Sequence, residues 1–141
     1  MNQNTKENIE TQIIDLEKAA LERWGRGDPS GFLEICADEV VYIDPYLERR
    51  IDGLAALKEY YEKLRGKVRF DRFELHNAKV QENRGVAVLT FNYISYTGQN
   101  ADRWNCTEVY RLFDERWKIV QTHWSYTQVF KYKCIQKGND R

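Results

Sequence analysis

Three side chains in this sequence combine a reactive chemical type with an unexpected position: Glu108, His123 and Asp44. Residues 104–113 alternate like a β-strand, and Glu108 falls on the bulkier, more apolar of the two faces. A buried carboxylate is costly unless it is paired or hydrogen-bonded. The position of Glu108 therefore indicates a site that contains polar partners.

The strand after Glu108 is predicted to begin at Trp117 and to place His123 on the same interior surface. A tight turn at 114–116 would make strands 104–113 and 117–126 antiparallel neighbours, with Glu108 near Gln121 or His123. The expected surface has an apolar end (Leu112, Trp117 and Ile119) and a polar end (Glu108, Gln121, His123 and Ser125).

Each of these residues also has a structural interpretation. Glu108 would serve equally as an edge residue or in an ion pair with a nearby Arg or Lys, and His123 as a neutral interior imidazole. Asp44 precedes Pro45, and Asp in that position readily closes a turn. A Ser125–His123–Glu108 triad and a metal site of His123, Glu108 and Asp44 are both weakly indicated, because no nucleophile elbow or metal-ligand spacing accompanies them.

Length, charge and composition limit the classes of protein to which this chain can belong. The 141 residues fit a single domain, 1–141, with an ordered core over about 5–130 and a frayed tail over 133–141. The 22 basic and 22 acidic residues cancel, which argues against a nucleic-acid partner. No apolar run would span a membrane or form a signal peptide, and three unpaired Cys are typical of a cytoplasmic protein. No nucleotide or metal motif is present, so we expect no cofactor.

The elements that must position these residues are helices first and strands afterwards. Apolar spacing predicts helices over about 5–24, from Pro29 to about 36, and from 53 to about 66. The predicted strands cover 40–43, 68–75, 78–82, 86–96, 104–113 and 117 to about 132. This order predicts an α+β fold in which a curved antiparallel sheet carries helices on one face.

Three stretches carry a family resemblance: WGRGDPSGFLEICADEVVYIDP, IDGLAALKEYYEKL and TEVYRLFDERWKIVQTHWS. Over roughly residues 8–128 the chain resembles SnoaL-like and ketosteroid-isomerase-like proteins of the nuclear transport factor 2-like superfamily. The inward His123 and Ser125 are also similar to the association domain of calmodulin-dependent kinase, although Trp124 replaces the Arg of that pattern. The resemblance implies a conical, cystatin-like sheet closed by N-terminal helices around a pocket, and a homodimer through the outer sheet face.

The resemblance also implies a chemistry and a set of site residues. The general base of the family aligns with Asp44, its neutral carboxylic acid with Glu108, and its helical tyrosine with Ala20, where that donor is missing. We expect a cofactor-independent isomerase or lyase for a small apolar molecule with a polar oxygen; the alternative is a non-catalytic binding or assembly module. The expected catalytic residues are Asp44, Glu108 and His123, and the expected ligand-binding residues are Trp24, Tyr42, Tyr61, Trp104, Tyr110, Gln121 and Ser125.

Overall fold

The computed structural model describes residues 3–127, which form three helices and six strands. The helices are α1 (Gln3–Trp24), α2 (Ser30–Leu33) and α3 (Leu54–Glu62). The strands are β1 (Cys36–Ile43), β2 (Ile51–Asp52), β3 (Arg72–Asn83), β4 (Val86–Thr97), β5 (Asn100–Phe113) and β6 (Arg116–Tyr126). The predicted tail, Cys134 and the continuation of the last strand to 132 lie outside the described residues.

The six strands form one sheet in the order β2-β1-β6-β5-β4-β3. Consecutive strands from β3 to β6 pair antiparallel, as the short turns between them require, whereas β1 pairs parallel to β6. The predicted α+β fold is confirmed, but the sheet is mixed because β1 lies beside β6, the last strand of the sheet in the sequence, and runs parallel to it. The short strand β2 was not predicted, and the two strands expected at 68–75 and 78–82 are one strand, β3, with an irregularity between His76 and Lys79.

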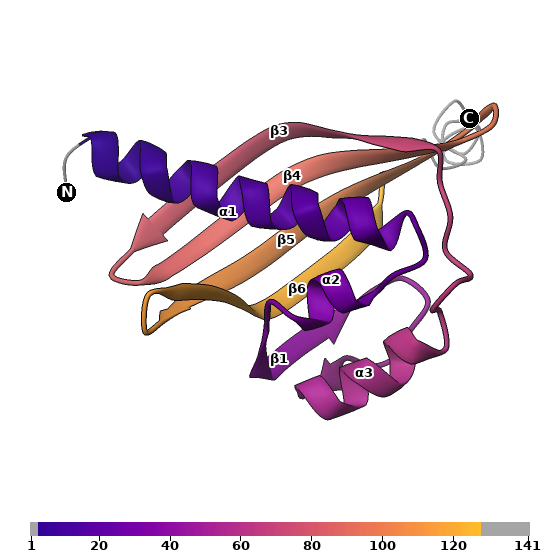
Figure 1. Ribbon diagram of the computed structural model, residues 1–141, viewed down its shortest axis with the longest axis horizontal. Coiled ribbons are helices and arrows are strands. Elements are labelled where there is room, and N and C mark those ends of the chain that lie inside the picture. The colour runs from indigo at the N-terminus through magenta and orange to yellow at the C-terminus, as the bar shows by residue number, and fades with distance from the viewer. Residues whose placement is uncertain (1–2, 128–141) are drawn as a thin grey trace, which may run out of the picture.

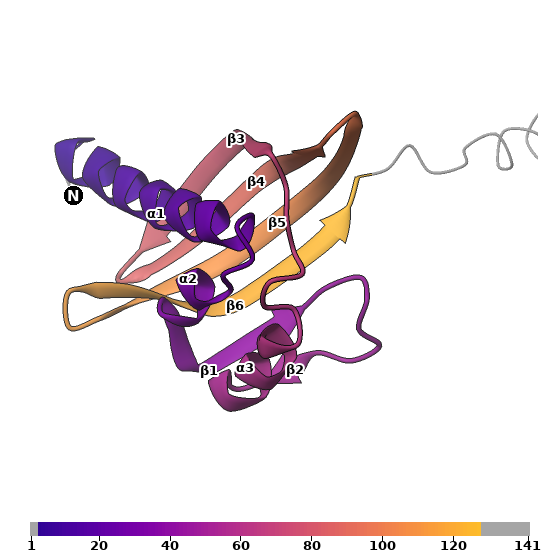
Figure 2. The ribbon, with the colours of Figure 1, turned by 45° about the vertical axis from the view of Figure 1, so that its right-hand side comes forward.

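The helices cover one face of the curved sheet. Figure 1 shows α1 lying across β3, β4 and β5, while α2 and α3 lie beside β1. In the turned view of Figure 2 the sheet curls around α1, and the long β4–β5 hairpin extends past the end of the helix. The core fills the concave side, where Ile13 and Leu21 of α1 and Leu57 of α3 are buried with Leu89 and Tyr110 of the sheet. In the described part of the chain, no helix combines the length and apolar character needed to cross a membrane.

Candidate functional site

The concave side of the sheet contains a cavity of about 340 Å³ beneath the C-terminal part of α1. This volume is at the lower end of the range of about 300–1,000 Å³ for small-molecule sites. Its wall is largely aromatic, and four predicted ligand-binding residues belong to it: Trp24, Tyr42, Tyr61 and Trp104. Further rings come from Phe32, Tyr46, Tyr60, Phe70, Tyr93 and Trp124.

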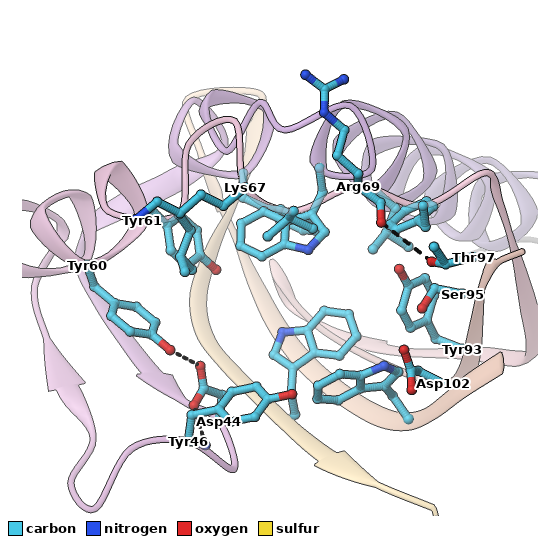
Figure 3. Close-up of a pocket in the computed structure, with 18 of the residues that line it drawn as sticks. Asp44, Tyr46, Tyr60, Tyr61, Lys67, Arg69, Tyr93, Ser95, Thr97 and Asp102 are labelled. Carbon is cyan, nitrogen blue, oxygen red and sulfur yellow. Dashed lines mark hydrogen bonds between the residues drawn. The ribbon is translucent and has the colours of Figure 1, made fainter. Parts of the chain in front are cut away.

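Asp44 is the carboxyl group on one side of this cavity, at the point where β1 ends. Its side chain is buried, and its Oδ2 accepts hydrogen bonds from the hydroxyls of Tyr42 at 2.8 Å and Tyr60 at 2.7 Å. Its Oδ1 accepts one from the backbone N–H of Tyr46 at 2.8 Å, which closes the turn before the next segment. Asp44 therefore has the predicted turn role and also faces the cavity (Figure 3).

The geometry at Asp44 leaves one acceptor position open. A carboxylate oxygen can accept about two hydrogen bonds, so the two tyrosines saturate Oδ2, whereas Oδ1 receives only one of these three bonds. Burial raises the pKa of Tyr60 above its ordinary value, and the hydrogen bond to Asp44 raises it further. The pKa of Tyr42 is raised in the same direction, first by burial and then by the neighbouring Tyr61 and Asp44. Both phenols consequently remain protonated donors at neutral pH.

Glu108 is buried as predicted, but its partners lie in the closed core and not at the cavity. Only 1% of Glu108 is exposed, and it accepts hydrogen bonds from Thr122 Oγ1 at 3.0 Å and Tyr110 Oη at 3.3 Å. Tyr110 Oη also donates to Glu17 Oε1 at 2.7 Å, so that hydroxyl is shared by two glutamates. Glu108, Glu17 and Tyr110 are all absent from the cavity wall.

The two glutamates form a buried acid pair that sequence reasoning did not find. Burial raises the pKa of Glu17 well above its ordinary value, and the charge of Glu108 raises it further. Burial also raises the pKa of Glu108, while hydrogen bonds from Glu17 and Thr122 oppose that shift. Among the described residues Glu17 Oε2 has no hydrogen-bond partner, so an ionised Glu17 would be unsolvated there. Glu17 is therefore the member that keeps its proton.

A β-bulge in β6 turns the other predicted polar residues away from the cavity. The β5–β6 register changes from Tyr110 opposite Ile119 to Val109 opposite Gln121, which leaves Val120 unmatched. One extra residue reverses the faces, because side chains alternate with a period of two. Thr122 and Trp124 point inward beyond the bulge, whereas His123 and Gln121 are exposed on the outer face. The inward orientation predicted for His123, Gln121 and Ser125 is wrong for this reason.

The outer face holds Ser125 in a chain of side-chain hydrogen bonds across four strands. The amide of Asn77 donates to Asn92 at 3.0 Å, Asn92 donates to Asn105 at 2.8 Å, and Asn105 donates to Ser125 at 3.4 Å. Leu112 pairs with Trp117 as predicted, yet it is 43% exposed and does not form an apolar interior end. Neither the triad nor the metal set considered from the sequence is assembled.

Known proteins share this architecture. The family model of the SnoaL-like domain matches residues 18–120. The chain belongs to the SnoaL-like family. The match includes the end of α1, Asp44, α3 and β5, whereas Glu17 and the end of β6 with Trp124 lie just outside it. No curated protein matches the chain significantly.

Solved structures extend the comparison of this SnoaL-like protein. A protein from Parabacteroides distasonis, provisionally named a ketosteroid isomerase, is 44% identical, with 92% of this chain and 96% of that chain covered and a TM-score of 0.81. A provisionally named dehydratase of the NTF2-like family from Streptomyces avermitilis is 19% identical, with coverages of 88% and 99% and a TM-score of 0.71. The association domain of C. elegans CaMKII is 14% identical, with coverages of 87% and 99% and a TM-score of 0.74. The last two show the fold alone.

Of the predicted site residues of this SnoaL-like protein, five line the cavity and five do not. Asp44, Trp24, Tyr42, Tyr61 and Trp104 belong to the wall; Glu108, His123, Tyr110, Gln121 and Ser125 do not. Sequence reasoning missed Tyr60 and Trp124, which line the cavity, and Glu17. The spacing of Glu17, four residues from both Ile13 and Leu21 on the buried side of α1, could have identified it.

Proposed function

We propose that this protein is a cofactor-independent isomerase or lyase that moves a proton on an apolar carbonyl compound, with Asp44 as the general base. The observation that carries the proposal is a buried carboxyl group with a fixed orientation in an aromatic cavity of about 340 Å³. Tyr42 and Tyr60 hold Oδ2, so Oδ1 is the oxygen with an acceptor position left for a substrate proton. The provisional name of the 44% identical relative is in keeping with this chemistry.

The proposed reaction balances without any added group. Asp44 Oδ1 forms a bond to the α-proton, the C–H electron pair becomes a carbon–carbon double bond, and the carbonyl oxygen becomes an enolate. Return of the proton to another carbon gives an isomer. In a lyase, the enolate expels a β-substituent, which leaves with the electron pair of its bond to carbon and takes the proton from Asp44. The enolate requires hydrogen-bond donors in an environment that excludes water.

Tyr61 is the donor that we propose for the enolate oxygen. Its ring packs edge-on against Tyr42 with centroids 5.4 Å apart, and its side chain is 3% exposed. Figure 3 shows the Tyr61 hydroxyl turned into the cavity on the same side as Asp44 and Tyr60. Burial raises the pKa of Tyr61 above its ordinary value, which keeps it a neutral donor. This assignment replaces Glu108 and His123, which the sequence predicted for that role.

The test is exchange of substrate α-protons with deuterated water, followed by NMR on a panel of cyclic and aryl ketones. Asp44→Asn keeps the shape of the side chain and removes the base, so we expect exchange to fall by about 10²–10⁴-fold. Asp114→Asn makes the same chemical change at the exposed β5–β6 turn and should leave exchange unchanged. Exchange that is equally fast in Asp44→Asn would exclude Asp44 as the base.

The alternative is a non-catalytic binding or assembly module that forms a homodimer through the outer sheet face. The chain of amide hydrogen bonds from Asn77 to Ser125 gives that face an ordered polar surface, and the association domain of C. elegans CaMKII has the same fold. Thr107→Lys would place a charge at the exposed centre of β5 and should yield a monomer by light scattering. Asn83→Lys, at the β3–β4 turn, is the matched control. A monomeric unsubstituted protein at micromolar concentration would contradict the dimer.

A further inference from the structure

The cavity has a second polar side, formed by side chains of the β4–β5 hairpin. Ser95 lies directly opposite Asp102, and Tyr93 directly opposite Trp104, and all four line the cavity. Ser95 is 8% exposed and Tyr93 is 5% exposed, so both are buried, whereas Asp102 is exposed. Burial raises the pKa of the Tyr93 phenol, which stays protonated. None of these groups contacts the Asp44 cluster through a hydrogen bond.

The two polar sides are separated by apolar rings. Figure 3 shows Asp44 and Tyr60 on one wall, and Tyr93, Ser95 and Asp102 on the opposite wall. The indoles of Trp104 and Trp124 pack edge-on with centroids 6.2 Å apart, and Trp124 packs against Tyr93 at 5.6 Å. A ligand that fills the cavity would therefore meet a polar group at each end and aromatic surface between them.

The second side contains a hydrogen-bond acceptor, the Asp102 carboxylate, that has no cationic partner in the described part of the chain. Lys67 and Arg69 also line the cavity, but within residues 3–127 neither forms an ion pair with Asp102. Figure 3 shows the Arg69 guanidinium pointing away from Asp102. A carboxylate accepts hydrogen bonds and donates none, whereas the Ser95 hydroxyl adapts to either role. The group best suited to this end is a hydrogen-bond donor.

We infer that the ligand is a carbonyl compound whose end remote from Asp44 carries a hydrogen-bond donor, a hydroxyl or a protonated amine, bound by Asp102 and Ser95. The inference rests on the proposed function in that it takes the cavity as the substrate site and Asp44 as its reactive end. A protonated amine would gain an additional contact with the indole faces of Trp104 and Trp124, which attract cations. A ligand hydroxyl would enter the cavity without taking a ligand charge out of water.

The experiment uses three aryl ketones that differ only in the remote substituent: methyl, hydroxymethyl or aminomethyl. Dissociation constants are measured by calorimetry or by quenching of the Trp fluorescence, on monocyclic and bicyclic skeletons. We expect at least one of the two donor ketones to bind about tenfold or more tightly than its methyl counterpart, a difference of about 1.4 kcal/mol. The preferred donor identifies whether the site takes a hydroxyl or an amine.

Two variants test whether Asp102 and Ser95 cause the preference for a donor substituent. Asp102→Asn removes the charge but keeps an acceptor, so a preference for aminomethyl should fall to about the hydroxymethyl level and a preference for hydroxymethyl should largely remain. Asp102→Ala combined with Ser95→Ala should abolish both preferences, and Asp114→Asn, the matched charge control, should change neither. Circular dichroism verifies that each variant is folded.

Three outcomes would overturn the inference: equal or tighter binding of the methyl ketones, an unchanged preference in the double alanine variant, or no binding of any ketone in the series. The result is separable from the proton-transfer test. Donor-selective binding without α-proton exchange would leave this inference intact and remove the proposed reaction. If α-proton exchange depends on Asp44 but the ketones bind without a preference for a donor substituent, the proposed reaction stands and this inference is removed.

Discussion

Two clusters on the concave side of the sheet contain the same chemical groups in opposite surroundings. At the cavity, the Asp44 carboxyl accepts hydrogen bonds from Tyr42 and Tyr60 beside about 340 Å³ of unfilled space. In the core, Glu108 and Glu17 share the Tyr110 hydroxyl, and none of the three residues lines that cavity. A carboxyl among tyrosines is thus not sufficient to define an active site, because access to a ligand separates the two clusters.

The largest contrast is expected in stability when each carboxyl is truncated. Glu108→Ala would remove a fully buried side chain and leave the Thr122 hydroxyl without its acceptor, at a cost of about 2–4 kcal/mol. Asp44→Ala should cost roughly 1 kcal/mol, because water can enter the adjoining cavity and bond the freed tyrosines. Urea denaturation measures both values. Equal losses of unfolding free energy in the two variants would show that water has no better access to Asp44 than to Glu108.

The tyrosines provide a more conservative comparison. Tyr110→Phe removes one hydroxyl that serves two buried glutamates and should destabilise the fold by about 1–3 kcal/mol without changing ketone binding. Tyr60→Phe removes one of two hydroxyls on Asp44 Oδ2 and should cost less than about 1 kcal/mol while slowing α-proton exchange. Tyr110→Phe should therefore lose stability and keep α-proton exchange, whereas Tyr60→Phe should keep most of its stability and show slower exchange. The same change in both variants would contradict the separation of the two clusters.

Glu17→Gln should stabilise the fold at neutral pH by about 1 kcal/mol or more, because each unit of a raised pKa corresponds to about 1.4 kcal/mol. The folded state keeps a proton on Glu17 above the ordinary carboxyl pKa of 4.5, whereas the unfolded state releases it. Stability that is full below pH 4.5 is consequently lost as pH rises toward the folded pKa. The amide of Gln mimics the protonated acid, accepts the Tyr110 hydrogen bond and does not titrate.

The measurement for this variant is the midpoint of urea unfolding from pH 4 to pH 9. The advantage of Glu17→Gln over the unsubstituted protein should be small at pH 4 and grow with pH. Glu22→Gln, an exposed position on the same helix, is the matched control. An advantage that stays constant with pH would mean that Glu17 is not the protonated member of the pair.

The smallest effect is expected at His123. The side chain is exposed on the outer face beyond the β6 bulge, so His123→Ala should change stability by less than about 0.5 kcal/mol and leave exchange unaltered. Denaturation and the deuterium assay check both expectations. Loss of exchange in this variant would require His123 to reach the cavity, against the observed strand register.

Much of the fold could be predicted from periodicity, and so could part of the site. The apolar spacing of α1 and α3 and the turns between β3, β4, β5 and β6 were sufficient to predict an α+β sheet with helices on one face. The family resemblance assigned a site role to Asp44, and the apolar strand face predicted that Glu108 is buried. Both residues are buried, but only Asp44 lines the cavity.

The assembly of the site could not be predicted, because it depends on one unmatched residue. Val120 in the β6 bulge reverses the alternation, so an uninterrupted period of two assigns His123 inward and Trp124 outward. The bulky side chains of Trp124 and Tyr126 were the available signal that the apolar face changes after residue 120. Whether the rings around Asp44 leave a hollow depends on side-chain packing in three dimensions, which a linear pattern does not specify.

The most direct test of the difference between the two clusters is α-proton exchange measured side by side in Asp44→Asn and Glu108→Gln. The thermal unfolding midpoint of each variant verifies that it is folded. The account predicts that exchange is lost in Asp44→Asn and persists in folded Glu108→Gln. Exchange that survives in Asp44→Asn but disappears in folded Glu108→Gln would place the chemistry in the buried acid pair and contradict the account.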